Sequence, residues 1–182
     1  MIFWIDLVRS KIIRLIFIPT WNLFLGRLLK IRRWWDELDG EPIILGALPF
    51  SRDVPRLQAG GVTGVINMCI EYPGPKNTYA QSGVQQLHLP TVDFTPPDLD
   101  DIHRAMDFID KHVEAGGKVY VHCKAGRGRS ATVVLCWLML RRRLTPEQAA
   151  AYLVKQRPHI NKGLAERAVV QEFHRTLLAE RT

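Results

Sequence analysis

The chain has 182 residues and a mass of 20.8 kDa, which suits one globular domain with a buried core. Apolar residues make up 47% of it and charged residues 24%, so disordered and fibrous classes are excluded. The net charge of +7 and the isoelectric point of about 9.6 favour an anionic partner.

The excess positive charge lies at the N-terminus. Residues 1–35 contain seven Lys or Arg and one Asp, a net of +6, whereas residues 36–182 contain 18 cations and 17 anions, a net of +1. The N-terminal segment also holds four of the five tryptophans, Trp4, Trp21, Trp34 and Trp35. We therefore divide the chain into a basic, aromatic segment, residues 1–35, and a nearly neutral body, residues 36–182.

The N-terminal segment is typical of an anchor that lies on a membrane surface. Its longest uncharged run, residues 15–26, contains Pro19 and is shorter than the roughly 20 residues that span a bilayer. A nucleic-acid arm is disfavoured, because the apolar side chains of residues 15–18 have no counterpart on a phosphate backbone. Tryptophan favours the headgroup level, and Lys and Arg attract anionic lipid. The alternative is a helical hairpin packed on the protein's own core.

The body alternates between patterns typical of strands and of helices. We expect strands at residues 43–45, 64–68, 85–89 and 118–122. We expect helices at residues 98–114 and 130–140, one starting at the capping box of Thr145, and one at residues 164–179. This order predicts a single α/β domain, with a mostly parallel central sheet flanked by helices.

Three cysteines, Cys69, Cys123 and Cys136, are too few and too widely spaced for a disulfide framework or a zinc site. Cys69 and Cys136 lie in apolar runs and are interpreted as buried hydrophobic residues. Cys123 instead opens a loop between the strand at 118–122 and the helix at 130–140. We predict no metal and no cofactor.

That loop, residues 122–130, has the sequence His-Cys-Lys-Ala-Gly-Arg-Gly-Arg-Ser. A loop between a strand and a helix N-terminus can bind an anion through its backbone N–H groups and the helix dipole. The same field stabilises a thiolate, so we predict that Cys123 is a nucleophile. We expect Arg129 to bind two phosphate oxygens and Ser130 to donate a hydrogen bond to the sulfur as it leaves.

The predicted substrate-binding residues are therefore all in this loop. They are Lys124, Ala125, Gly126, Arg127, Gly128 and Arg129. The Cys-x5-Arg-Ser pattern resembles the cysteine-dependent protein tyrosine and dual-specificity phosphatase superfamily. Rhodanese-type sulfurtransferases have a shorter loop without the Arg-Ser ending, and low-molecular-weight phosphatases and arsenate reductases have their loop near the N-terminus.

Phosphoryl transfer to sulfur leaves an alkoxide that needs a proton, so a carboxylic acid is expected from another loop. We assign this acid to Asp93, which follows the strand at 85–89, and expect its neighbours Val92 and Phe94 to desolvate it. Asp98, Asp100 and Asp101 compete, but just after two prolines they are better suited to cap and charge the start of a helix, and Asp93 is preferred to Asp98 on that argument.

A wider resemblance extends from about Ile18 to His174. Its motifs are Trp34-Trp35-Asp36, residues 44–50, residues 53–57, Glu71-Tyr72, Thr91-Val92-Asp93 and Arg157-Pro158-His159. They are similar to the mitochondrial-type dual-specificity phosphatases that act as phosphatidylglycerophosphate phosphatases. The resemblance implies hydrolysis of the terminal phosphomonoester to phosphatidylglycerol, a step towards cardiolipin, by a monomeric domain on the cytoplasmic face of a bacterial inner membrane or on a mitochondrial inner membrane. Family members often have Glu-Glu-Tyr where this chain has Ile70-Glu71-Tyr72.

Lys124 and Arg127 add two cations to the loop, which suits a lipid headgroup with a phosphodiester beside its phosphomonoester. They can equally be solvated surface charges that raise the rate of association. A phosphoinositide or phosphoprotein phosphatase is the alternative enzyme. A membrane-recruited module that binds phosphate without hydrolysing it is the non-enzymatic alternative, although such a module needs neither a nucleophile nor an acid.

Overall fold

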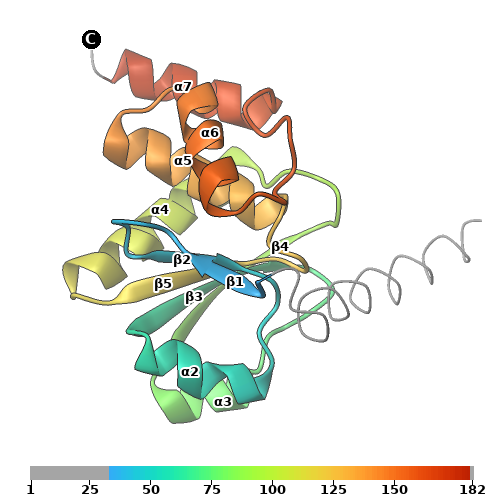
Figure 1. The fold of residues 1–182 in the computed structure, drawn as a ribbon, viewed down its shortest axis with the longest axis vertical. Helices are drawn as coiled ribbons and strands as arrows, with labels where there is room; N and C mark the ends of the chain where they lie inside the picture. The colour runs from blue at the N-terminus through green and yellow to red at the C-terminus, as the bar shows by residue number, and fades with distance from the viewer. Residues whose placement is uncertain (1–32, 181–182) are drawn as a thin grey trace, which may run out of the picture. The chain divides into compact units, whose positions relative to one another are not determined.

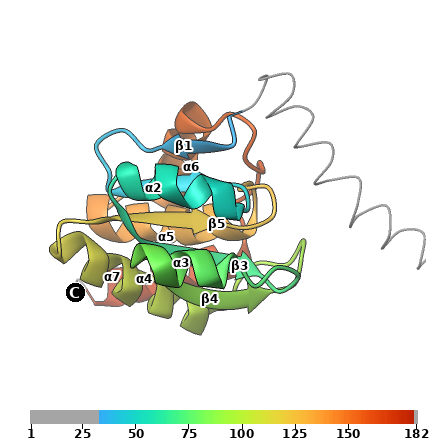
Figure 2. The same ribbon diagram turned by 90° about the horizontal axis from the view of Figure 1, so that it is seen from below.

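The computed structural model describes residues 33–180. The predicted N-terminal segment, residues 1–35, therefore lies outside the described residues except for its last three. Figures 1 and 2 show a central sheet with α2 (Val54–Ala59) and α3 (Lys76–Ser82) on one face and the longer helices on the other. The sheet therefore has two hydrophobic layers, one on each face.

The sheet has five strands in the order β1-β2-β5-β3-β4. Their bounds are Trp35–Glu37 for β1, Ile43–Gly46 for β2, Val62–Cys69 for β3, Gln85–Thr91 for β4 and Lys118–His122 for β5. Only β1 runs antiparallel to its neighbour. The four expected strands and the mostly parallel α/β sheet are confirmed, whereas β1 is too short to show an alternating pattern in the sequence.

The longer helices are α4 (Leu99–Glu114), α5 (Arg129–Arg142), α6 (Pro146–Gln156) and α7 (Ala168–Ala179), and a short 3-10 turn, η2 (Ser51–Asp53), precedes α2. The expected α4, α5 and α6 are confirmed, including the capping box of Thr145 and Gln148. The last helix begins at Ala168, four residues later than expected, because the buried Leu164 and Ala165 pack within turns.

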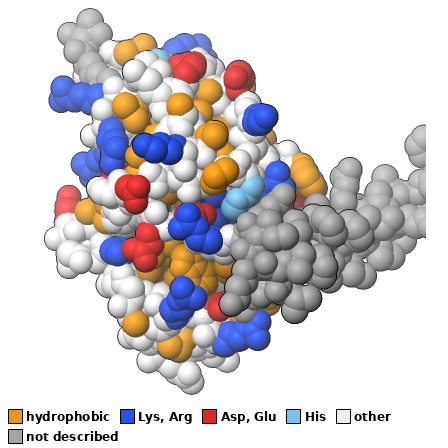
Figure 3. All heavy atoms as spheres, viewed as in Figure 1, with side chains coloured by type: hydrophobic (Ala, Val, Ile, Leu, Met, Phe, Trp, Pro, Cys, Tyr) orange, Lys and Arg blue, Asp and Glu red, His pale blue; other side chains and the backbone are white. Residues whose placement is uncertain are grey.

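Helix α5 lies at the centre of the larger layer, with every side chain from Arg129 to Met139 buried. This explains why its sequence is apolar nearly all round. Over the face of the molecule seen in Figure 3, basic and acidic side chains are interspersed, in agreement with the small net charge of residues 36–182.

A buried ion pair joins the first strand to the segment after α6. Arg157 follows α6, is 1% exposed and forms an ion pair with Asp36 of β1. Its Nε donates to the carbonyl of Gly126 at 3.0 Å, and its Nη2 donates to that of Ala125 at 3.1 Å. One guanidinium therefore connects β1, the segment after α6 and the loop that follows β5.

Removing this guanidinium should destabilise the protein strongly. Arg157→Leu leaves Asp36 as a buried charge without its ion pair, which costs about 3–5 kcal/mol in free energy of unfolding. Arg104→Leu is the control, because Arg104 makes an exposed pair with Asp101 that contributes at most about 1 kcal/mol. Urea denaturation followed by circular dichroism measures both. A loss below 1 kcal/mol in Arg157→Leu would contradict this role.

Candidate active site

The loop after β5 wraps around the sulfur of Cys123 and leads directly into α5. Gly126 has a positive φ of 66°, and a Cβ on it would lie 2.4 Å from the backbone C and O of Gly46. A side chain at position 126 is therefore excluded by both conformation and space. The backbone of the loop therefore packs directly against the end of β2.

Cys123 is buried and has a pKa below its ordinary value. Burial alone raises this pKa, but it is outweighed by the charge of Arg129, by the Ser130 hydroxyl and by the N–H groups of Ser130 and Arg127. The Oγ of Ser130 donates to Sγ at 3.3 Å. Cys123 is therefore poised as a thiolate, the form that attacks phosphorus.

The other two cysteines, which also lie in the described part of the chain, differ from Cys123. Burial raises the pKa of Cys69 and raises that of Cys136 to about 12. Both are fully buried, as the sequence predicted. Neither is suited to act as a nucleophile at neutral pH.

Arg129 extends from the first turn of α5 towards the ends of β3 and β4. Its guanidinium makes a two-point contact with Glu71, through Nη1 to Oε2 at 2.9 Å and Nη2 to Oε1 at 2.8 Å. Nη1 also donates to the carbonyls of Thr91 at 2.8 Å and Met68 at 3.2 Å. Burial raises the pKa of Glu71, but hydrogen bonds to Arg129 and to the Glu71 backbone, together with the charges of Arg129 and Lys124, outweigh it, and the net shift is downward. Arg129 is therefore held in one orientation by a carboxylate.

Asp93 lies in the turn after β4, with Oδ1 2.8 Å from Nη2 of Arg129 and Oδ2 3.9 Å from Nζ of the buried Lys124. Asp98 instead caps α4, where its Oδ1 accepts from the N–H of Asp101 at 2.8 Å. Of these two candidate acids, only Asp93 contacts Arg129 in the ion pairs of residues 33–180.

The expected desolvation of Asp93 by its neighbours is wrong. Val92 is 55% exposed and Phe94 is 64% exposed, so both side chains lie largely in solvent. The tight turn explains this arrangement. The N–H of Thr95 donates to the carbonyl of Val92 at 3.2 Å, and Phe94 has a positive φ of 67°. Cations, and not apolar contacts, surround the carboxylate of Asp93.

The remaining loop residues are held by hydrogen bonds with α5 and with the segment after α6. The Nε of Arg127 donates to the carbonyl of His159 at 2.6 Å, so part of its guanidinium is engaged by the segment after α6. The carbonyls of Ala125 and Gly126 accept from Arg157, and that of Gly128 accepts from the hydroxyl of Thr132. These backbone oxygens are thereby turned away from the sulfur and its anion site.

Two residues that support the site were not identified from the sequence. Glu71 and Arg157 were noted only as parts of motifs, although one orients Arg129 and the other holds the loop. A carboxylate two residues after the end of a buried strand is the signal that could have identified Glu71. His122 is fully buried, and burial lowers its pKa to about 3, so it is neutral at physiological pH.

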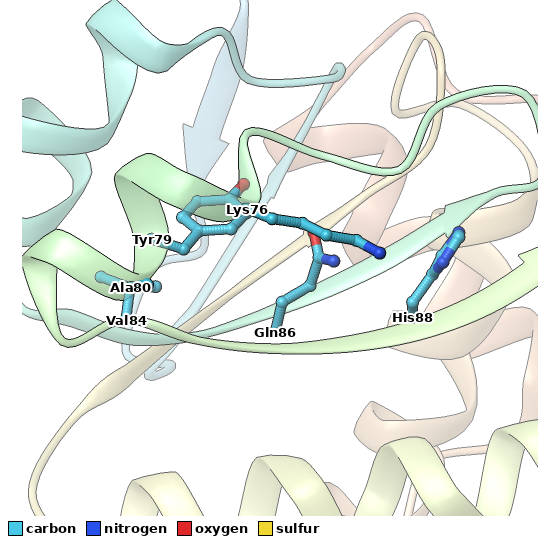
Figure 4. A pocket seen from close by; sticks show the side chains of 6 residues that line it. All are labelled: Lys76, Tyr79, Ala80, Val84, Gln86 and His88. Carbon is cyan, nitrogen blue, oxygen red and sulfur yellow. The ribbon is translucent and has the colours of Figure 1, made fainter.

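Within residues 33–180, no group of three or more His, Cys, Asp or Glu is arranged to hold a metal ion. The same residues include no helix long and apolar enough to cross a bilayer. A cavity of about 340 Å³ lies between α3 and β4, and its lining includes Lys76, Gln86 and His88. Figure 4 shows these side chains. None of the loop residues 123–130 lines the cavity.

Alkylation by iodoacetamide should report the state of the three thiols. Because the thiolate reacts, Cys123 should be modified at neutral pH, and its rate should fall as the pH drops through its lowered pKa. Ser130→Ala removes a hydrogen bond to the charged form, so the rate at pH 6.5 should fall about tenfold. Peptide mass spectrometry measures each site. Modification of Cys69 or Cys136 as fast as Cys123 would contradict these assignments.

Comparison with known proteins places this site in a family. Residues 43–176 match the dual specificity phosphatase catalytic domain. Phosphatidylglycerophosphate phosphatase PTPMT2 of Arabidopsis thaliana is 41% identical over 167 residues, which cover 89% of this chain and 73% of that protein. Phosphatidylglycerophosphatase and protein-tyrosine phosphatase 1 of Homo sapiens is 36% identical over 188 residues, which cover 97% of this chain and 92% of that protein.

Solved structures agree with these relatives. The structure of PTPMT1 in complex with PI(5)P has a TM-score of 0.74 and 37% identity, over 82% of this chain and 99% of that one. Human DUSP28 has a TM-score of 0.69 and 26% identity, over 80% of this chain and 95% of that one. The resemblance expected from the loop is confirmed, and the chain belongs to the dual specificity phosphatases, which are cysteine-dependent phosphoric monoester hydrolases.

Proposed function

We propose that this protein hydrolyses the terminal phosphomonoester of phosphatidylglycerophosphate to give phosphatidylglycerol. The observation that carries the proposal is the buried Cys123 of lowered pKa, bound by Ser130 and lying in the field of Arg129. Relatives with the name phosphatidylglycerophosphate phosphatase, aligned over most of this chain, support the choice of substrate.

Substrate binding begins with displacement of one carboxylate. A phosphate dianion accepts hydrogen bonds from the loop N–H groups and from Arg129, and it takes the place of Asp93 at Nη2. Glu71 keeps its two-point contact, so the guanidinium stays oriented. Asp93, released from Arg129, faces the leaving oxygen as the proposed general acid.

Hydrolysis then follows in two steps. The Cys123 thiolate attacks phosphorus, the bond from phosphorus to the glycerol oxygen breaks, and Asp93 gives its proton to that oxygen. In the second step Asp93 accepts a proton from water, and the water oxygen attacks the phosphocysteine. The bond from sulfur to phosphorus breaks, Ser130 stabilises the departing thiolate, and inorganic phosphate leaves.

The charge beside the site supports a lipid headgroup. Lys124 is buried next to Asp93, where it can approach a second phosphate group on the same substrate. The structure of PTPMT1 with PI(5)P makes a phosphoinositide the second candidate substrate. We further propose that residues 1–35 hold a monomeric catalytic domain, residues 36–182, on a membrane surface. That surface is a bacterial inner membrane on its cytoplasmic face or a mitochondrial inner membrane.

Phosphate release from a substrate panel tests this function. The panel holds phosphatidylglycerophosphate, phosphoinositides and a phosphotyrosine peptide, each with and without anionic vesicles. Phosphatidylglycerophosphate should be hydrolysed at least about tenfold faster than the others, and Cys123→Ser should abolish hydrolysis while it retains binding. Equal rates on all three substrates, or full activity in Cys123→Ser, would contradict the proposal.

A further inference from the structure

Large hydrophobic side chains are exposed at five positions in the described residues. They are Ile70 at 55%, Val92 at 55%, Phe94 at 64%, Val154 at 42% and Leu178 at 50%. The last two lie singly on α6 and α7. The first three, here called the apolar rim, lie in the two loops that carry Glu71 and Asp93. Exposed apolar residues gathered at one functional site indicate an interaction surface.

The two loops of the apolar rim are joined. The N–H of Ile70 donates to the carbonyl of Thr91 at 3.4 Å, which places Ile70 beside Val92. Glu71 and Asp93 both bind Arg129, so the loops also converge on one guanidinium. Carboxylates point inward from these loops, and the neighbouring hydrophobic side chains point outward. The rim therefore borders the entrance to the Cys123 site.

The outward position of Phe94 is fixed by the backbone. Its φ of 67° is in the left-handed region, which a bulky side chain rarely adopts. The conformation is held by the hydroxyl of Thr95, which donates to the carbonyl of Val92 at 2.8 Å, and by Oδ1 of Asp93, which accepts from the N–H of Phe94 at 3.1 Å. A strained conformation maintained at a functional site points to a role for the displayed side chain.

A lysine and a histidine lie on the β4 edge of the sheet, next to the strand end that precedes Ile70. Lys76 and His88 line the cavity at the β4 edge, and in Figure 4 the amine of Lys76 points towards His88. A ring nitrogen of His88 is 2.7 Å from the carbonyl of Cys69, the residue before Ile70. An apolar surface with a neighbouring lysine matches the interface of an anionic bilayer, where charged headgroups lie over hydrocarbon.

We propose that the apolar rim of Ile70, Val92 and Phe94 inserts into an anionic phospholipid bilayer and seats the Cys123 site on the membrane surface. This rests on the proposed lipid substrate, because the phosphate of a membrane lipid reaches Arg129 only when the entrance lies at the headgroup level. A phosphoprotein surface is the competing occupant of the rim. Aliphatic and phenyl side chains beside a lysine suit lipid at least as well as protein, and lipid alone brings the substrate with it.

A depth measurement tests insertion without any hydrolysis. Val92→Cys in the full-length Cys123→Ser chain carries a nitroxide, and Leu178→Cys in the same background is the matched control. Cys69 and Cys136 are buried with raised pKa values and should stay unlabelled. On vesicles of phosphatidylcholine and phosphatidylglycerol, the label at position 92 should become accessible to oxygen and shielded from a nickel chelate. The label at position 178 should remain in water.

Kinetics test the consequence for the substrate. The variant with Ile70→Ser, Val92→Ser and Phe94→Ser should lose about tenfold or more in kcat/KM on phosphatidylglycerophosphate in vesicles, since it gives up the burial of three apolar side chains. On a short-chain, monomeric form of the lipid its rate should stay within about twofold of the wild type. The pair Val154→Ser and Leu178→Ser should change neither rate.

The outcomes separate this inference from the proposed function. If the label at position 92 stays in water in the presence of vesicles, the proposed insertion of the apolar rim is wrong, whatever the enzyme hydrolyses. If the triple rim variant loses activity on a phosphoprotein and keeps it on lipid in vesicles, the apolar rim binds protein, and the proposed insertion is also wrong. If the label inserts but phosphatidylglycerophosphate is not hydrolysed, insertion of the apolar rim is confirmed and the proposed substrate is wrong.

Discussion

The site depends on one guanidinium buried behind it. Arg157 binds the carbonyls of Ala125 and Gly126 and pairs with Asp36, which is 121 residues away in the chain. With those carbonyls held at the back, backbone N–H groups of the loop donate to the sulfur of Cys123. A contact between the first strand and the segment after α6 therefore supports the loop whose N–H groups face the sulfur.

Much of the fold could be predicted, because its main elements carry strong local patterns. The strands β2, β3 and β5 are mainly apolar, β4 alternates Leu87 and Leu89 with polar residues, and α6 begins at a capping box that is present in the structure. The elements that were missed are short: β1 has three residues, and α2 and α3 have six and seven. They are stabilised by packing on the sheet, which no local window of sequence reveals.

The site was predictable where its residues are close in sequence, and less so where they meet through the fold. Cys123, Arg129 and Ser130 lie on one loop, and the structure brings Asp93 to Arg129 as expected. The pairing of Arg129 with Glu71 spans 58 residues and depends on the ends of β3 and β5 lying side by side. The outward turn of the residues beside Asp93 depends on backbone conformation, which the residue types did not indicate.

The most direct measurement is rapid-quench mass spectrometry of the phosphorylated enzyme. Asp93→Asn removes both the acid of the first step and the base of the second, so hydrolysis of phosphatidylglycerophosphate should slow strongly. With p-nitrophenyl phosphate, whose leaving group needs no proton, a phosphoryl group should accumulate on the peptide that contains Cys123. Asp98→Asn keeps a helix-capping side chain and should turn over without accumulation. A phosphoryl group on any other residue, or accumulation in Asp98→Asn and not in Asp93→Asn, would contradict a Cys123 nucleophile served by Asp93.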